Sequence, residues 1–193
     1  MNILVIGDSH SYAGWENISI PEIKIKSLHL GPKLMYSFGK SKMKVVNDNN
    51  IKNIDVIVFC FGEIDVRCHI PKYKNEYEKV IENLVDNYFE SIKSNVNILS
   101  NIKVCVYNIP PPSKSFEVKN KNFPFVGTDQ ERKIYTLTLN EKLRESCKKN
   151  KFVFIDIYSF YCDDEGFLNE KVSDGTVHIK EPKPLINFIT ENL

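Results

Sequence analysis

The sequence predicts an α/β fold, a three-layer α/β/α sandwich around a mostly parallel sheet. Four short apolar runs rich in Val, Ile and Phe lack strict alternation, and longer segments with apolar residues at three- and four-residue steps separate them. Runs of the first kind are typical of strands covered on both faces, and their alternation with helices implies crossovers between parallel strands. With 193 residues, the chain fits one domain with a full hydrophobic core.

The strands are expected at the four apolar runs, residues 2–6, 56–61, 103–108 and 152–157. Val45 and Val46 indicate a further short strand. Sites in such sheets form beyond the carboxyl ends of the strands, so the residues that follow each run are the first candidates for chemistry.

Helices are expected between the strands. The clearest pattern covers residues 72–96, with Pro71 at its start, where proline is tolerated. Shorter helices are expected around residues 31–38 and 184–192. These elements provide the two outer layers of the sandwich.

A second long helix is expected over residues 129–149, capped by Thr128 or Asp129. Before it, the proline-containing and aperiodic stretch 109–127 indicates either a functional flap or a tolerated surface insertion. The buried side of the helix is expected to consist of Ile134, Leu137, Leu139 and Leu143.

Charge and cysteine usage exclude several classes of function. The net charge is +1 and the lysines are spread along the chain, so nucleic acid and anionic membranes are not indicated as partners. The five cysteines include no C-x-x-C pair, which argues against a disulfide framework or a zinc site, and Cys60 and Cys105 are expected in the core. No signal-peptide pattern and no apolar run near ~18 residues is present, so a cytoplasmic protein without membrane insertion is expected.

The tetrapeptide Gly7-Asp8-Ser9-His10 directly follows the first strand. Glycine allows a sharp turn there, and Ser9 would project near the amino end of the next helix, where free N–H groups stabilise an oxyanion. The alternative is a Ser or Asp that only caps a helix.

The pentapeptide Asp174-Gly175-Thr176-Val177-His178 lies near the carboxyl end of the chain. A serine hydroxyl needs a base that accepts its proton, and a carboxylate usually orients that base. Asp174 and His178 would supply both functions to Ser9.

Two further stretches follow predicted strands or precede helices. Glu63, Asp65, Arg67 and His69 crowd the segment after the second long run, where they form either a solvated loop or a site wall. In the second case Arg67 would pair with Asp65 or Glu63, or bind an anionic part of a substrate. Gly31 could offer a backbone N–H to a ligand.

The order of these motifs resembles the SGNH, or GDSL-type, hydrolase superfamily. GDS stands near the amino terminus, followed by a lone Gly, a G-x-x-D loop after the next long strand, and D…H near the end. The resemblance spans essentially the whole chain. It implies a flavodoxin-like sheet within the α/β/α sandwich, and a single SGNH-hydrolase-like domain over residues 1–193.

The resemblance also implies roles for individual residues. Ser9 would be the nucleophile, His178 the general base and Asp174 its orienting carboxylate, with the N–H groups of Ser9 and Gly31 as oxyanion donors. No metal and no organic cofactor is implied. The residues expected to contact the substrate are Asp8, His10, Glu63, Asp65, Arg67 and His69.

Two departures from the family pattern stand out. The third block of the family is usually G-x-N-D, whereas this chain has Gly62-Glu63-Ile64-Asp65, so the Asn oxyanion donor is replaced by an apolar residue. Arg67, His69 or His10 would have to take its role, or the chemistry is weakened. In addition, the family separates its Asp and His by two residues, but three separate Asp174 from His178.

Two functions follow as expectations. The first is a serine esterase or acyltransferase that acts on O-acyl groups, most plausibly O-acetyl groups, of a carbohydrate through an acyl-serine intermediate. The second is a catalytically impaired protein of the same fold that binds a sugar or nucleotide-sugar in glycan biosynthesis. Ile64 is the feature that favours the second.

Overall fold

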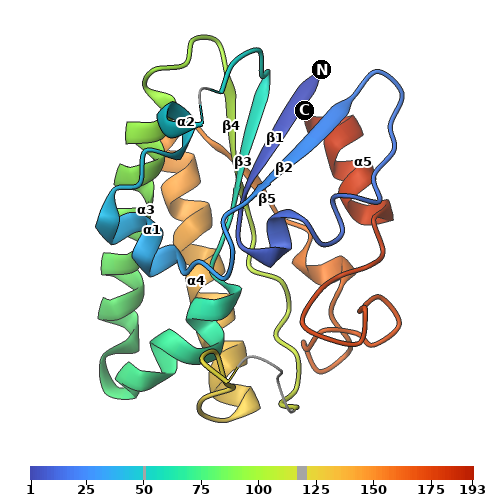
Figure 1. Cartoon of the computed structure of the whole chain (residues 1–193). Helices are drawn as coiled ribbons and strands as arrows, with labels where there is room; N and C mark the ends of the chain where they lie inside the picture. The colour runs from blue at the N-terminus through green and yellow to red at the C-terminus, as the bar shows by residue number, and fades with distance from the viewer. Residues whose placement is uncertain (50, 117–120) are drawn as a thin grey trace.

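The computed structural model describes residues 1–49, 51–116 and 121–193, and within them five parallel strands form one sheet in the order β2-β1-β3-β4-β5 (Figure 1). This order is flavodoxin-like, with the switch in direction at β1 and β3. The predicted sandwich with a parallel sheet is therefore confirmed. The strands are β1 (Asn2–Gly7), β2 (Lys24–His29), β3 (Val56–Cys60), β4 (Lys103–Tyr107) and β5 (Val153–Ile155).

Helices cover both faces of the sheet. In Figure 1, α1 to α4 lie to the left of the strands and α5 to the right. Short 3₁₀ or π turns lie at Ser9–Ser11, Asp65–His69, Ile70–Glu76 and Tyr158–Phe160. The α-helices are α1 (Met35–Ser41), α2 (Val45–Asp48), α3 (Tyr77–Val96), α4 (Asp129–Asn150) and α5 (Lys183–Asn192).

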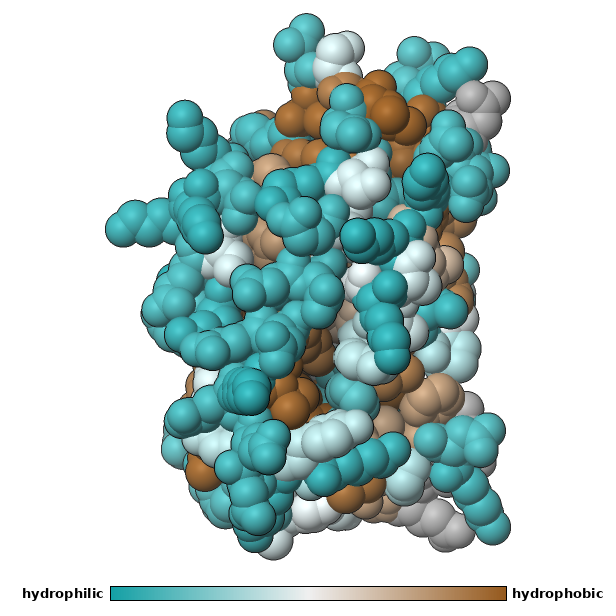
Figure 2. All heavy atoms as spheres, turned by 90° about the vertical axis from the view of Figure 1, so that its left-hand side faces the viewer, coloured by the Kyte–Doolittle hydropathy of each residue, from teal (hydrophilic) through white to brown (hydrophobic). Residues whose placement is uncertain are grey.

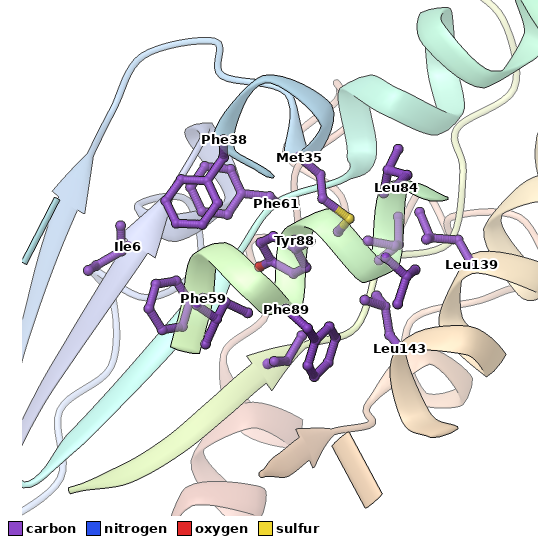
Figure 3. Packing of buried hydrophobic residues seen from close by; sticks show 14 of the residues in the cluster. Ile6, Met35, Phe38, Phe59, Phe61, Leu84, Tyr88, Phe89, Leu139 and Leu143 are labelled. Carbon is purple, nitrogen blue, oxygen red and sulfur yellow. The ribbon is translucent and has the colours of Figure 1, made fainter. Parts of the chain in front are cut away.

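Each face of the sheet has its own hydrophobic cluster. On the α1–α4 side, the rings of Phe38 and Phe61 stack with centroids 4.8 Å apart, and Tyr88 packs edge-on against both (Figure 3). On the α5 side, Trp15 and Ile189 belong to the second cluster. Figure 2 shows the outer face of the α1–α3 layer, which is mostly hydrophilic, so these helices are amphipathic and point their apolar stripes at the sheet.

The predicted strand at Val45 and Val46 is wrong, because both residues lie in the short helix α2. The side chain of Asn95 accepts a hydrogen bond from the N–H of Val46 at 3.1 Å, which fixes this turn against α3. The fifth strand is instead β2, which the sequence analysis did not predict. β2 is an edge strand whose exposed and half-buried residues mostly alternate, so it lacks the continuous apolar run used to find the others.

The buried side of α4 also differs from the expectation. Ile134 and Leu137 are each 48% exposed, whereas Leu139 and Leu143 are buried as predicted. At 3.6 residues per turn, Ile134 lies roughly 140° around the helix from Leu139, so the two cannot share one narrow face. The helix begins as predicted, because the Thr128 side chain accepts a hydrogen bond from the N–H of Glu131 in a capping box.

The carboxyl ends of the strands meet at the lower end of the molecule in Figure 1, where the loops gather. Gly7 ends β1 there, and a Cβ at this position would lie 1.8 Å from the carbonyl oxygen of Cys60. Only glycine permits this close approach of β1 to β3. It sets the start of the Asp8–Ser9 turn directly beside the end of β3.

Candidate active site

Ser9 and His178, which are far apart in sequence, lie in hydrogen-bond contact. Ser9 is half-buried at the start of a 3₁₀ turn that Asp8 caps, and its Oγ lies 2.8 Å from Nε2 of His178. A hydroxyl that donates to an imidazole nitrogen is set up to lose its proton during attack on a substrate. The structure therefore brings together the two residues that the sequence analysis paired.

The other ring nitrogen of His178 faces two oxygen groups. Its Nδ1 lies 2.9 Å from Oγ1 of Thr176 and 3.3 Å from Oδ2 of Asp174. The Thr176 hydroxyl donates to Oδ1 of Asp174 at 2.6 Å, so its oxygen is left to accept from Nδ1–H of His178. Thr176 thus links the carboxylate to the imidazole, and the shorter contact of His178 is to the hydroxyl.

A bulge accommodates the three residues between Asp174 and His178. An isolated antiparallel bridge between Ser173 and Ile179 closes the loop, and Gly175 inside it has φ +89°. That left-handed conformation favours glycine and turns the chain so that the Asp174 carboxylate comes back to His178. Thr176 was not predicted as a site residue, although a hydroxyl two positions before the histidine is the signal that could have identified it.

Burial and neighbouring charges set the protonation of this group. Burial lowers the pKa of His178 to about 4, and the charge of His10 contributes in the same direction, although Asp174 opposes both. Partial burial acts to raise the pKa of the Asp174 carboxyl, but hydrogen bonds from Thr176 hold this pKa below its usual value. At neutral pH, His178 is therefore a neutral base beside an ionised Asp174.

The backbone donors expected at the oxyanion end are available. Between described residues, neither the N–H of Ser9 nor that of Gly31 donates a hydrogen bond to a protein acceptor. Gly31 has φ +74° in the turn between β2 and α1, and a Cβ placed on it would meet no atom within 4 Å. The space beside Gly31 is thus open to a ligand.

The side chain at the usual Asn position adds nothing polar to this end. Ile64 is apolar and only 3% exposed. The next residue, Asp65, is completely buried and accepts hydrogen bonds from the N–H groups of Met35 and Tyr36 at 2.7 and 3.1 Å. Burial raises the pKa of Asp65 to about 7, although these two hydrogen bonds act to lower it. Asp65 therefore caps α1, and both of its oxygens are engaged there.

The other predicted site-wall residues are engaged with protein groups. Glu63 pairs with Arg67, with Oε1 and Nε 2.9 Å apart, and burial raises the pKa of Glu63 despite the guanidinium charge. Arg67 also donates to the carbonyl of Phe123 at 3.0 Å, so it holds the 109–127 loop, of which residues 117–120 lie outside the described residues. His69 lies between two tyrosine rings, with centroids 4.5 Å from Tyr36 and 5.5 Å from Tyr73.

His10 is buried between the turn after β1 and the His178 loop. Its Nδ1 lies 3.2 Å from Oδ1 of Asp8, and its Nε2 lies 3.1 Å from the carbonyl oxygen of Val177. The ring centroids of His10 and His178 are 4.9 Å apart. Asp8 and His10, which were expected to contact substrate, thus contact each other and the loop that carries the base.

A cavity of about 610 Å³ borders the base loop at Gly175 and Thr176. Its wall combines polar side chains with the apolar side chains of Phe116, Phe167 and Leu168. Among the described residues, no group of three or more His, Cys, Asp or Glu side chains could hold a metal ion, and the described helices include none that is long and apolar enough to cross a membrane. The cavity wall includes Ser113, Lys114, Ser115, Asp163, Asn169, Lys171 and Ser173.

Similar solved structures include several with ester-hydrolase descriptions. A GDSL-like lipase from Bacteroides thetaiotaomicron aligns over 98% of this chain and 86% of its own, with TM-score 0.62 and 15% identity. A lipase from a goat rumen metagenome aligns over 98% of this chain and 96% of its own, with TM-score 0.66 and 12% identity. Phospholipase A1 from Streptomyces albidoflavus covers 100% of this chain and 99% of its own, with TM-score 0.64 and 9% identity.

Comparisons with protein-family models and with curated proteins give no match. The identities of the structural neighbours are low, so what they share with this chain is the arrangement of the sheet and its helices. The resemblance predicted from the motifs is confirmed at this level: the chain has the fold of the GDSL-type hydrolases.

Proposed function

We propose that this protein is a serine esterase or acyltransferase that uses Ser9 as its nucleophile. The observation that carries the proposal is the 2.8 Å contact between Oγ of Ser9 and Nε2 of His178. On the far side of the imidazole, Thr176 and Asp174 hold Nδ1, which leaves Nε2 free to accept the serine proton.

The chemistry proceeds in two acyl transfers. Oγ of Ser9 attacks the ester carbonyl while Nε2 of His178 takes its proton, and the tetrahedral intermediate collapses when His178 returns that proton to the leaving alcohol. The acyl-serine is then attacked by water or by an acceptor hydroxyl, whose proton passes to His178 and then to Ser9. The carboxylate of Asp174 stabilises the imidazolium that forms in each half, in part through the Thr176 hydroxyl.

Two backbone donors stabilise the developing oxyanion. The N–H groups of Ser9 and Gly31 have no described protein acceptor and are assigned this role. The Asn side chain of related proteins is replaced here by Ile64. Removal of one donor from a working oxyanion hole costs ~10²–10³ in rate, so a slow enzyme is expected.

The substrate is proposed to be an O-acyl carbohydrate, most plausibly an O-acetyl sugar. The cavity beside Thr176 supports this choice, because its wall includes the amide of Asn169 and the ammonium group of Lys171, which can donate to a polar alcohol. A ligand with several hydroxyl groups can pair with these donors, whereas a long acyl chain would leave them unpaired.

The first test is covalent labelling with a fluorophosphonate probe. The wild-type protein is expected to become labelled at Ser9, and Ser9→Ala is expected to abolish labelling. Ser94→Ala removes an exposed hydroxyl on α3 and serves as the matched control, which should label like the wild type. Intact labelling of the Ser9→Ala protein would refute the assignment of the nucleophile.

The substrate class is tested with a panel of esters. Acetylated monosaccharides and oligosaccharides are compared with p-nitrophenyl esters of increasing acyl length, each with and without an acceptor sugar. Release of acetate from the sugars, or its transfer to the acceptor, is the expected result. Faster turnover of long-chain esters than of any sugar ester would contradict the carbohydrate assignment.

A second function is favoured by one observation, the buried Ile64 at the position of the missing donor. In this alternative the protein binds a sugar or nucleotide-sugar and has lost turnover. Calorimetric binding of such a ligand, together with no acyl-enzyme formation across the ester panel, would support it. A burst of acyl-enzyme would eliminate it.

A further inference from the structure

Both ring nitrogens of His10 face oxygen atoms of the protein. The side chain is only 5% exposed, its Nε2 lies 3.1 Å from the carbonyl oxygen of Val177, and its Nδ1 lies 3.2 Å from Oδ1 of Asp8. A carbonyl oxygen can only accept a hydrogen bond, so Nε2 must carry a proton. A neutral imidazole would then present a lone pair on Nδ1 to the Asp8 carboxylate.

The surroundings of Asp8 argue against a neutral ring. Asp8 is completely buried, and its Oδ2 has no hydrogen-bond partner among the described residues. The contact of its Oδ1 with His10 is the ion pair that the structure gives this carboxylate. A buried carboxylate without a positive partner is strongly destabilising. An imidazolium at His10 can donate to Oδ1 of Asp8 and to the carbonyl oxygen of Val177, and its charge compensates that of the carboxylate.

We propose that His10 is an imidazolium in the resting protein and acts as a positioning residue for His178, through its charge and through its hydrogen bond to Val177. This inference rests on the proposed function of Ser9 and His178. It gives the His residue after the nucleophile a role that is distinct from oxyanion donation, because both of its N–H groups are already used.

The hydrogen bond fixes the loop that carries the base. Val177 directly precedes His178, so the Nε2–H of His10 holds the backbone of the base loop against the turn that carries Ser9. This contact is separate from those that Thr176 and Asp174 make with Nδ1 of His178. Two separate contacts therefore set the position of the imidazole above Ser9.

The charge acts on the protonation of His178. The charged and titratable groups that face His178 are His10, Asp174 and Asp8, and Glu63 in turn faces His10. Burial opposes protonation of His10, but the hydrogen bond and charge of Asp8 outweigh it and raise the pKa of His10. The positive charge then helps to keep His178 in its neutral, basic form and adds positive potential near Ser9, where the Asn donor is absent.

The protonation state is tested directly by nuclear magnetic resonance on the full chain labelled with ¹⁵N. Long-range ¹H–¹⁵N spectra report the protonation of each ring nitrogen, and single His→Gln variants assign the four histidines. At pH 7, both nitrogens of His10 are expected to be protonated, and Nε2 of His178 is expected to be unprotonated. A single protonated nitrogen on His10 would overturn the proposal, whatever the activity of the protein.

The functional part is tested by the pH dependence of fluorophosphonate labelling. His10→Gln can still donate to Val177 but removes the charge, so the pKa of His178 should rise from about 4. It should not return fully to 6.5, because burial, the larger cause of the shift, remains. Labelling near pH 5.5 should therefore fall by less than tenfold and change little at pH 8, because a tenfold loss of free base at pH 5.5 requires a pKa of about 6.5. His10→Leu removes the hydrogen bond as well and should slow labelling at both pH values.

His29→Gln is the matched control, since His29 is exposed at the end of β2, and its pH profile should follow the wild type. An equal loss at every pH in His10→Gln would overturn the electrostatic role and leave a structural one. If the wild-type protein is not labelled at any pH, the proposed function fails, while the resonance experiment still decides the charge of His10.

Discussion

The two ends of the candidate active site differ in how many protein contacts hold their functional groups. At the base end, His178 is held by Thr176 and Asp174 on one side and by the contact of His10 with Val177 on the other. At the proposed oxyanion end, the N–H groups of Ser9 and Gly31 have no acceptor among the described residues, and the side chain at the usual Asn position is the apolar Ile64. The proposed base is thus held by several protein contacts, whereas the proposed oxyanion site has only two backbone donors.

This difference locates the weak step of the proposed reaction. A positioned base contributes typically 10²–10⁴ to a rate, and each oxyanion donor contributes a similar amount. Because the base end is complete, we expect Ser9 to react readily with an activated phosphonate but slowly with an ordinary ester. Disruption of the base end should therefore cause the larger losses, and repair of the oxyanion end should cause gains.

The largest effect is expected for His178→Asn. Without the imidazole, Ser9 keeps its proton, and the labelling rate should fall by about 10³-fold or more. Circular dichroism and urea denaturation should show a folded protein, since His178 lies in a loop. A loss of less than tenfold would mean that His178 is not the base.

Ile64→Asn should strengthen the weak end. An amide at this position would restore a third donor and raise kcat/KM for an ester by about 10- to 10²-fold. Ile64→Leu keeps the side chain apolar and of similar volume, so it is the matched control and should show no gain. An Asn variant that is folded but no faster than the Leu variant would show that this position does not face the oxyanion.

A smaller effect is expected at Thr176, where the hydroxyl links Asp174 to the imidazole. Thr176→Val is similar in shape but removes the link, and the labelling rate should fall about tenfold. Thr176→Ser keeps a hydroxyl and should retain most of the rate. Equal rates for the Val and Ser variants would indicate that Asp174 acts on His178 directly, across the 3.3 Å contact.

How much of this the sequence could predict depends on the kind of signal. The continuous apolar runs identified β1, β3 and β4, because strands buried on both faces need such residues throughout. The edge strand β2 has one exposed side and its pattern was missed. Ser9 and His178 were paired from residue type and order alone. In the structure, their side chains lie within hydrogen-bond distance.

Other parts of the site could not be predicted, because they depend on how loops fold. The link through Thr176 exists only because the loop bulges at Gly175. Both nitrogens of His10 are engaged only because the base loop returns over the first turn, 167 residues away in sequence. Asp65 was expected to contact substrate, but its position after β3 places it under the first turn of α1.

The smallest effect concerns stability rather than rate. Burial raises the pKa of Asp65 to about 7, which lies above its unfolded value of 3.8, so ionisation is disfavoured in the folded state. The contribution of Asp65 to the free energy of unfolding is then greatest below pH 4 and is lost as the pH rises through 7. Asp65→Asn should flatten this part of the pH dependence, measured by urea denaturation at pH 4 to 8. It should leave the labelling rate within about threefold, because the amide oxygen can still accept from one of the two N–H groups at the start of α1. An unchanged slope together with a much lower labelling rate would contradict a purely structural role for Asp65 as the cap of α1 and would favour its predicted contact with substrate.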